Sequence, residues 1–412
     1  MNVAIFTNAY KPIISGVVNC IDLMRQHLIK KGHKVFLFAP EFSGYKDKDE
    51  NVYRYPSINL TNKVKFPLPI TIFPIAEKIM TTEKIDVIHC HHPFVLGEEG
   101  ARWAERLKIP LFFTFHTQYE QYAHYIPLPE NLVKSAAKYV VSSYTKKCSV
   151  IITPGTAIVE QLREYGITKN VVHMNNSISL DAFRNLDREK IRKKYNIAEN
   201  EKLLVYIGRM AQEKNIPFMI DCFEKIKTEI PSRLMIIGEG PELESFVLYV
   251  KNKGLEKDII FPGRVEYNEI PEYYAVAQAF IMTSTTEVKP LALLEAMASG
   301  LPIIAVNACG VSDTVIDGFN GLLTGENKEE FVNAVVKVIS DETLLQKMSE
   351  NSINVSKEYC ADNLTERLIS LYNDAILNKK RKKRLFLDRR QRHFLGLIKL
   401  VRSAKKFFLT KY

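Results

Sequence analysis

Two acids and two cations in this sequence have the types and spacing needed to bind a charged substrate. In the stretch TTEVKPLALLEAMASGLP, Glu287 and Glu295 flank Pro290, where an apolar, alanine-rich helical pattern begins. Arg209 and Lys214 stand in an earlier segment, GRMAQEKN. Fixed cations bind phosphates, whereas a carboxylate is repelled by phosphates and suits neutral sugar hydroxyls. The four charged residues together indicate a site for a nucleotide diphosphate.

The helical pattern after Pro290 predicts where each acid would act. Proline suits the first turn of a helix, where its missing N–H costs nothing, and the free amides of residues 291–293, beginning with Leu291, would face an anion. Glu295, about a turn further on, would reach the two hydroxyls of a ribose, and Glu287 would face a sugar hydroxyl in the cleft. Alternatively, Glu287 is an ordinary loop acid and Glu295 a solvated acid favoured by the helix dipole.

The elements that must hold these residues alternate between apolar strands and amphipathic helices. This alternation predicts parallel sheets covered by helices on both faces, and ligands bind beyond the carboxyl ends of such strands. We therefore expect an α/β protein of two tandem Rossmann-like domains with a deep cleft between them. Strands are expected over 2–8, 34–40, 85–92, 110–116 and 149–155, then over 202–209, 233–240, 259–264, 279–285, 302–306 and 321–324. Helices expected in the second half include 217–229, 241–253 and 290–299.

Length and composition agree with this division. A chain of 412 residues exceeds the size at which a single core keeps growing, and 46% hydrophobic with 25% charged residues is typical of a globular protein. The predicted boundaries are 1–185 for an acceptor-binding domain, 186–375 for a nucleotide-sugar-binding domain and 376–412 for a tail. No apolar run is long enough to span a membrane, and the first residues lack a basic segment typical of a secretory signal, so a cytoplasmic location is expected.

Residues that commonly bind metals do not form a convincing site. The six cysteines lie far apart without a C-x-x-C pair, which argues against a disulfide framework and a zinc site. His89 and His91 lie on one face of a strand end, but no acid or cysteine accompanies them at ligand spacing. We expect them to be hydrogen-bonded or to line the cleft, and we expect no metal.

Several motifs, taken together, resemble a known family. GRMAQEKN, GEGP, FPGRV and the E-x₇-E pair followed by AMASGLP are similar to the C-terminal half of retaining glycosyltransferases of the glycosyltransferase-B fold, group 1 or family 4. YKPIISGVVN and HHPF…FTFHTQYEQYAHY resemble the N-terminal half. The resemblance covers about residues 1–375, and HTQYEQYAHY is most similar to bacterial 1,2-diacylglycerol 3-glucosyltransferases. Each motif alone would be weak evidence.

The resemblance assigns roles to individual residues. Arg209 and Lys214 would bind the donor diphosphate and stabilise the departing nucleotide, Glu295 would bind the ribose, and Glu287 would lie near the donor sugar. His116 would lie beside the transferred sugar, so His116, Arg209, Lys214 and Glu287 are the catalytic candidates. Further donor-binding candidates are Gly16, Val17, Gly238, Gly240, Pro241, Arg264, Val265, Lys289, Pro290 and Leu291. Arg264 and Val265 would read the base.

One segment departs from the family pattern, and one loop has two interpretations. The family has glycine where this chain has Pro290, so an amide offered to the donor is absent here and Lys289 is expected to compensate with its charge. The tyrosines of the 119–125 loop, Tyr119, Tyr122 and Tyr125, either pack internally or guide an acceptor together with His116. The family chemistry implies retention of the anomeric configuration without a metal, with the leaving phosphate accepting the proton.

The excess positive charge lies in the tail. Residues 378–412 hold 14 Lys or Arg and one Asp, a charge of +13, so the rest of the chain carries −3 against the overall +10. On a helical wheel of residues 391–409, apolar side chains share one face and cations another, as in segments that bind anionic bilayers. Nucleic acid is the rival partner, disfavoured by the apolar stripe, and a disordered solubilising tail is a third interpretation.

Together these features predict an enzyme that transfers glucose from UDP-glucose to membrane diacylglycerol with retention, giving α-monoglucosyldiacylglycerol. The enzyme would be peripheral on the inner face of the cell membrane, bound to anionic lipid, with no nucleic acid and no obligate protein partner. Two alternatives stay open. One is transfer from another nucleotide sugar to a phosphoinositide or polysaccharide, and the other is a non-catalytic nucleotide-binding protein at the membrane surface.

Overall fold

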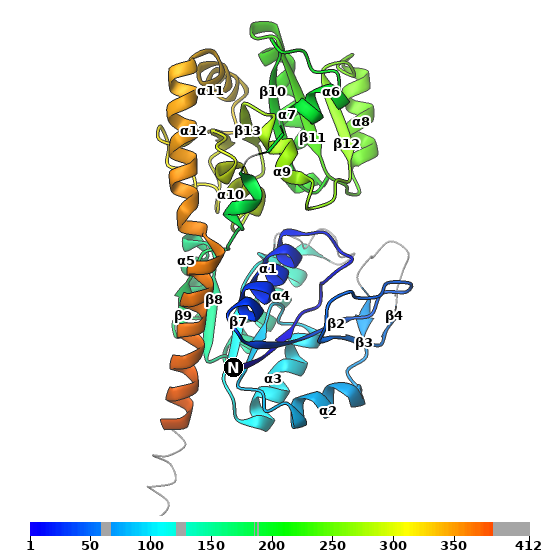
Figure 1. Ribbon diagram of the computed structural model, residues 1–412, viewed down its shortest axis with the longest axis vertical. Helices are drawn as coiled ribbons and strands as arrows, with labels where there is room; N and C mark the ends of the chain where they lie inside the picture. Colours follow the sequence, from blue (N-terminus) through cyan, green and yellow to red (C-terminus); the bar gives the residue numbers. More distant parts are fainter. Residues whose placement is uncertain (59–66, 121–128, 185, 188, 382–412) are drawn as a thin grey trace, which may run out of the picture.

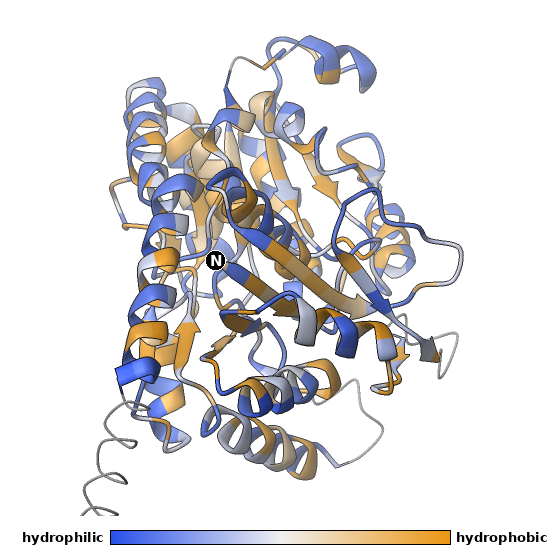
Figure 2. Ribbon diagram, turned by 60° about the horizontal axis from the view of Figure 1, so that its bottom comes forward, coloured by the Kyte–Doolittle hydropathy of each residue, from blue (hydrophilic) through white to orange (hydrophobic). Residues whose placement is uncertain are grey.

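The protein folds into two α/β domains stacked along its long axis (Figure 1). The computed structural model describes residues 1–58, 67–120, 129–184, 186–187 and 189–381, and only the backbone of Ala157. Each domain is built on a parallel sheet, as the alternating pattern predicted. Figure 2 shows that the central strands are mainly hydrophobic, because both of their faces are covered.

The N-terminal sheet has the strand order β3-β2-β1-β6-β7-β8-β9. Its strands are β1 (Asn2–Phe6), β2 (Lys34–Pro40), β3 (Val52–Tyr55), β6 (Val87–Cys90), β7 (Leu111–Thr114), β8 (Val150–Thr153) and β9 (Val171–His173). Its helices are α1 (Gly16–Lys30), α2 (Pro74–Thr82), α3 (Val95–Leu107), α4 (Glu130–Thr145) and α5 (Thr156–Glu164). The sequence pattern missed β3, β9 and the small antiparallel pair β4 (Ser57–Ile58) and β5 (Leu68–Pro69), because short edge strands carry little periodic signal.

The C-terminal sheet has the order β12-β11-β10-β13-β14-β15. Its strands are β10 (Lys202–Ile207), β11 (Ser232–Ile237), β12 (Ile259–Gly263), β13 (Ala279–Met282), β14 (Ile303–Val306) and β15 (Gly321–Thr324). Its helices are α6 (Glu189–Lys194), α7 (Ile216–Glu229), α8 (Leu243–Asn252), α9 (Ile270–Ala275), α10 (Leu291–Ala298), α11 (Lys328–Ser340) and α12 (Glu342–Ser356). One continuous core of buried side chains fills this domain.

A last helix, residues 361–381, follows α12 back to the N-terminal domain and runs beside that domain in Figure 1. Leu368 and Tyr372 lie in the same buried cluster as Val3 and Ile5 of β1. The division at residue 375 stays a prediction, but in space this helix packs on the first domain. Residues 382–412, most of the expected tail, lie outside the described part of the chain. No described helix is long and apolar enough to span a bilayer.

Candidate active site

Several of the expected site residues follow strands at the reversal points of the two sheets. The strand order reverses between β1 and β6 in the first sheet and between β10 and β13 in the second. In parallel sheets the crevice beyond the carboxyl ends at such a point is where ligands bind. Gly16 follows β1, Arg209 and Lys214 follow β10, and Glu287 follows β13. Topology therefore brings residues from distant parts of the sequence to these crevices.

Lys214 and Glu287 form a largely buried ion pair. The Lys214 ammonium Nζ lies 2.5 Å from Glu287 Oε1, and their side chains are only 11% and 18% exposed. The loop carrying Lys214 is fixed to the end of β13, because the Thr283 hydroxyl lies 3.0 Å from each of the carbonyls of Lys214 and Asn215. The Lys214 cation is thus held in place by a carboxylate that a diphosphate would replace.

The helices α1 and α10 begin against each other across the two domains. A carbon added at Gly16, the first residue of α1, would lie 3.7 Å from Leu291 Cδ1 at the start of α10. Each helix start carries a partial positive charge from its free amides. Two such ends lie together next to Val17, as the predicted diphosphate site would require; anion binding there stays a prediction.

Pro290 differs in detail from its expected position. It is the N-cap of α10, with φ −69° and ψ 121°, rather than a residue of the first helical turn. The amide of Leu293 donates to the Pro290 carbonyl at 3.2 Å, so one of the three amides expected to face an anion already has a partner. The chain enters α10 directly after the proline ring. Of the three amides, those of residues 291 and 292 would remain for a phosphate.

Glu295 is buried, with 4% of its surface exposed, and both of its oxygens accept hydrogen bonds. Tyr267 donates to Oε1 at 2.9 Å and Tyr274 to Oε2 at 3.2 Å. Burial raises the pKa of Glu295 to about 6, although the two tyrosine hydroxyls oppose this shift. These tyrosines were not among the expected site residues. A ribose at Glu295 would share the carboxylate with them.

Lys289 differs from the expectation that its charge compensates for Pro290 at the donor. Its side chain is 6% exposed, its Nζ donates to the carbonyl of Asp313 at 3.0 Å, and it lies over the ring of Tyr359. Burial lowers its pKa to about 8. The Lys289 amino group therefore links the start of α10 to the loop after β14, because its N–H donates to a carbonyl of that loop.

The glycines of GEGP are required by packing between loops. A carbon added at Gly238, where φ is +140°, would lie 1.9 Å from the carbonyl oxygen of Gly208. The same addition at Gly240 would lie 2.0 Å from the Met210 carbonyl oxygen. These glycines, followed by Pro241, press the loop after β11 against the segment that carries Arg209. Donor contacts of this loop stay a prediction.

Arg209, Arg264 and Val265 lie toward the rim of the C-terminal domain. Arg209 is exposed directly after β10, and the side chain of Arg264 is 46% exposed with its Nε 3.3 Å from Glu266 Oε1. Val265 is partly buried against the domain core. Arg264 and Val265 immediately follow β12, at the carboxyl edge where a base would be read.

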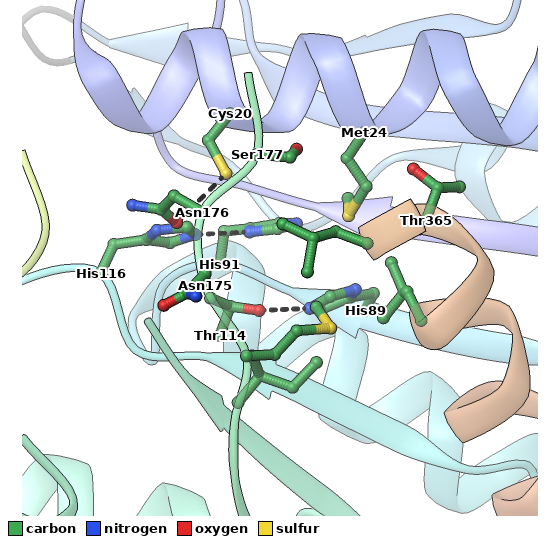
Figure 3. A pocket seen from close by; sticks show the side chains of 14 residues that line it. Cys20, Met24, His89, His91, Thr114, His116, Asn175, Asn176, Ser177 and Thr365 are labelled. Carbon is green, nitrogen blue, oxygen red and sulfur yellow. Dashed lines mark hydrogen bonds between the residues drawn. The ribbon is translucent and has the colours of Figure 1, made fainter. Parts of the chain in front are cut away.

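His116 follows β7 and bonds to His91, which follows β6. His91 Nδ1 lies 2.8 Å from His116 Nε2, and the two rings stack at 5.1 Å (Figure 3). Burial lowers the pKa of His116 to about 3. His89 is hydrogen-bonded to Tyr372 and Thr114. In the part of the chain that the structure describes, no group of three metal-binding side chains could hold an ion.

The tyrosine loop is only partly described. Tyr119 packs edge-on against Phe94 and Phe115, at 4.9 and 5.8 Å between ring centres. Tyr122 and Tyr125 lie outside the described residues. Packing is thus the role visible for Tyr119, and acceptor binding by the loop stays a prediction.

Sequence comparisons identify relatives along the whole chain. The family profiles "Glycosyltransferase Family 4" and "Glycosyl transferases group 1" match residues 14–182 and 187–355. An "Alpha-monoglucosyldiacylglycerol synthase" of Acholeplasma laidlawii is 31% identical over 92% of this chain and 100% of its own. One of the same name from Streptococcus pneumoniae is 30% identical over 94% and 89%. The chain belongs to the glycosyltransferases of group 1 and family 4.

Two further similarities bear on the fold and on the family's range of donors. HepE of Anabaena, solved in complex with UDP and glucose, superposes on this glycosyltransferase with a TM-score of 0.75 at 17% identity, covering 91% of this chain and 100% of the other. That likeness shows the GT-B fold. A "GDP-mannose-dependent alpha-mannosyltransferase" of Corynebacterium glutamicum is 27% identical over 92% of this chain and 91% of its own.

The site of this glycosyltransferase suits cleavage of a bond to a diphosphate. When such a bond breaks, negative charge develops on the leaving phosphate, and cations or helix amides fixed in advance stabilise it. Lys214 and the paired starts of α1 and α10 are groups of this kind; that they hold the donor phosphates stays a prediction. The carboxylates of Glu287 and Glu295 can accept hydrogen bonds from hydroxyl groups; their contacts with a donor stay predictions. The sequence signal for Tyr267 and Tyr274 was present in EYNEIPEYY, but nothing in the spacing linked it to Glu295.

Proposed function

We propose that the protein transfers glucose from UDP-glucose to the free hydroxyl of diacylglycerol, with retention, to give α-monoglucosyldiacylglycerol. The observation that carries this proposal is the full-length similarity, at 30 and 31% identity, to two proteins named for that product. The paired helix starts and the Lys214–Glu287 pair supply a site of matching chemistry.

In the proposed reaction the glucose C1–O bond to the diphosphate breaks, and its electron pair stays on the leaving phosphate oxygen. The diacylglycerol oxygen attacks C1 from the same face and gives its proton to that phosphate oxygen. Arg209, Lys214 and the amides at the starts of α1 and α10 stabilise the developing charge. Glu295 binds the ribose, Glu287 a hydroxyl of glucose, and His116 lies beside the transferred sugar.

Acceptor access is proposed to occur at a membrane. The acceptor is insoluble in water, and the basic residues 378–412 would bring the enzyme to an anionic bilayer on the inner face of the cell membrane. The described residues 376–381 continue the last helix along the N-terminal domain, where Lys379 Nζ donates to the Ile109 carbonyl at 2.6 Å. The tail thus starts from the same domain that carries His116 and the tyrosine loop.

A second donor is a specific alternative. The relative from Corynebacterium glutamicum is named for GDP-mannose, and Pro290 replaces the glycine that the family offers to the donor. Transfer of mannose to a lipid or glycan acceptor would use the same diphosphate site and differ in how the sugar and base are read.

Incubation with radiolabelled UDP-glucose or GDP-mannose and diacylglycerol in anionic vesicles tests the proposal. We expect a labelled glycolipid from UDP-glucose, with the α anomer identified by NMR. Glu287→Gln is expected to abolish transfer and retain vesicle binding. Labelling of a soluble sugar in place of lipid would reject the acceptor, and labelling only from GDP-mannose would reject the donor.

A further inference from the structure

Three stacked histidines run from the buried His89 to the half-buried His116 in the N-terminal domain. The rings of His89 and His91 stack at 4.5 Å and 21°, and those of His91 and His116 at 5.1 Å and 23° (Figure 3). His89 is held from both sides, by the Tyr372 hydroxyl at 2.6 Å and the Thr114 hydroxyl at 2.7 Å. Because His89 is fixed, the plane of the His91 ring stacked on it is fixed as well.

His91 and His116 must divide the roles of donor and acceptor. Burial lowers the pKa of His91 well below its usual range and that of His116 to about 3, so both rings are neutral near pH 7. A neutral imidazole carries its proton on one nitrogen only. The 2.8 Å contact between His91 Nδ1 and His116 Nε2 therefore needs a proton on one of these two atoms.

The other nitrogen of His91 indicates which atom carries the proton. His91 Nε2 and Asn175 Oδ1 are both buried without a partner among the described residues, and both residues line one cavity of about 40 Å³. An amide oxygen only accepts hydrogen bonds. A proton on His91 Nε2 would supply a donor to it, directly or through a water, for which the cavity has room. His91 Nδ1 is then an acceptor, and His116 Nε2 carries the proton.

We propose that His91 is a positioning residue for sugar transfer: it accepts from Nε2–H of His116 and thereby holds His116 with a lone pair on Nδ1 for a hydroxyl of the transferred sugar. This inference rests on the proposed function for the reaction, but the tautomer itself does not. His116 is half-buried and lines the same cavity, and its Nδ1 has no hydrogen bond to any described residue. An orienting partner of this kind is what a histidine at a reaction centre needs.

A long-range proton–nitrogen correlation spectrum of the full chain with isotope-labelled histidine tests the tautomer directly. We expect a protonated Nε2 and an unprotonated Nδ1 for His116, assigned by comparison with His116→Asn. A protonated Nδ1 on His116 would overturn the proposal. This measurement needs neither an acceptor nor a variant of His91, so it stands even if the donor or acceptor proposed above is wrong.

Two substitutions at His91 test the effect on the reaction. Asparagine places an acceptor oxygen near the position of Nδ1, so His91→Asn should keep kcat within about threefold. His91→Phe removes the acceptor and should lower kcat on the order of tenfold, with Kd for UDP changed less than about twofold. Equal losses in both variants, or no loss in His91→Phe, would contradict the proposal.

Controls separate positioning from a general loss of structure. His33 contacts the N-terminal amine, and His33→Asn should leave kcat unchanged. Thermal melting of each variant shows whether it is folded. If His91→Phe does not fold, Tyr372→Phe, which removes the hydroxyl bonded to His89, should give a smaller loss of kcat without loss of UDP binding. An unchanged kcat in a folded Tyr372→Phe would contradict the positioning role, just as a protonated His116 Nδ1 contradicts the tautomer.

Discussion

Lys214 and Glu287 pair two charges that the predicted donor would have to separate. Their contact of 2.5 Å is largely withdrawn from water, so each charge depends on nearby groups for stabilisation. A bound diphosphate would compete with Glu287 for the same ammonium. Donor binding would then free the Glu287 carboxylate for a sugar hydroxyl. Phosphate binding by Lys214 and sugar binding by Glu287 would thus be coupled.

Removing one member of this pair should cost stability that removal of both restores. Lys214→Met should lower the free energy of unfolding by about 2 kcal/mol, less than for a fully buried pair, because Glu287 loses its counter-charge. The double variant Lys214→Met with Glu287→Gln should recover most of this loss and still lack transfer. Urea unfolding measures the three variants. A double variant as unstable as the single one would show that the pair is not coupled.

Lys289 predicts a dependence of stability on pH. Its folded pKa of about 8 lies below the ordinary 10.5, so between these values the unfolded chain binds more protons and stability rises with pH. The full gain would be on the order of 3 kcal/mol, at about 1.4 kcal/mol for each pKa unit. Relative to Lys289→Met, the unaltered protein should therefore gain stability from about pH 8 to 10.5. Denaturant titrations at several pH values measure the free energy of unfolding of both proteins. Curves of stability against pH that run parallel for the two proteins would refute this prediction.

At the scale of elements, the site depends on where α1 and α10 begin. Ser15 caps α1 by accepting from the Val18 amide, and Pro290 starts α10. The two starts meet at Gly16 and Leu291, so a residue of the first domain and a residue of the second together border the expected phosphate position. Asn176 adds a bond across the domains, donating to the Lys289 carbonyl at 3.1 Å.

Gly16 offers a test in which stability and binding should separate. An added carbon would make only an ordinary contact with Leu291, and alanine favours a helix over glycine by up to about 1 kcal/mol. Gly16→Ala should therefore leave thermal stability unchanged or raised, while it weakens UDP-glucose binding by occupying space near the phosphates. Gly240→Ala, which would clash with the Met210 carbonyl, is the contrast and should destabilise the fold. Calorimetry measures the affinity for UDP-glucose. An unchanged affinity in Gly16→Ala would show that the donor phosphates do not lie next to Gly16.

In the molecule as a whole, the chain passes between the two domains twice, and the two connecting segments are hydrogen-bonded to each other. Ile178 donates to the Tyr359 carbonyl at 2.9 Å and accepts from the Ala361 amide at 3.1 Å. The returning helix then delivers Tyr372 to His89. The first domain is thus completed by the last described residues of the sequence, so it cannot be regarded as an independent N-terminal unit.

Two truncations should have different effects. Removing residues 382–412 should leave the fold and UDP binding intact and release the protein from anionic vesicles, an effect that raised salt should mimic. Removing 361–412 should also remove Leu368 and Tyr372 from the core and unfold the first domain. Vesicle sedimentation and thermal melting measure both outcomes. Persistent vesicle binding without residues 382–412 would show that the tail is not the membrane anchor.

The two Rossmann-like domains could be predicted from the sequence, because the alternation of strands and helices and their hydrophobic periodicity are local properties. The sequence also indicated that Arg209, Lys214, Glu287 and Glu295 belong to one site, because strand ends in a parallel sheet meet at one edge. It misjudged Lys289, whose direction depends on a carbonyl 24 residues away.

The contacts between side chains could not be predicted and are seen only in the folded protein. The tertiary structure placed Tyr267 and Tyr274 on Glu295, His91 on His116, and the last helix on the first domain. These contacts join segments that are distant in the chain, and no periodicity or spacing encodes them. They depend on how the two domain cores and the segments that connect them pack together. That packing exists only when the whole chain has folded.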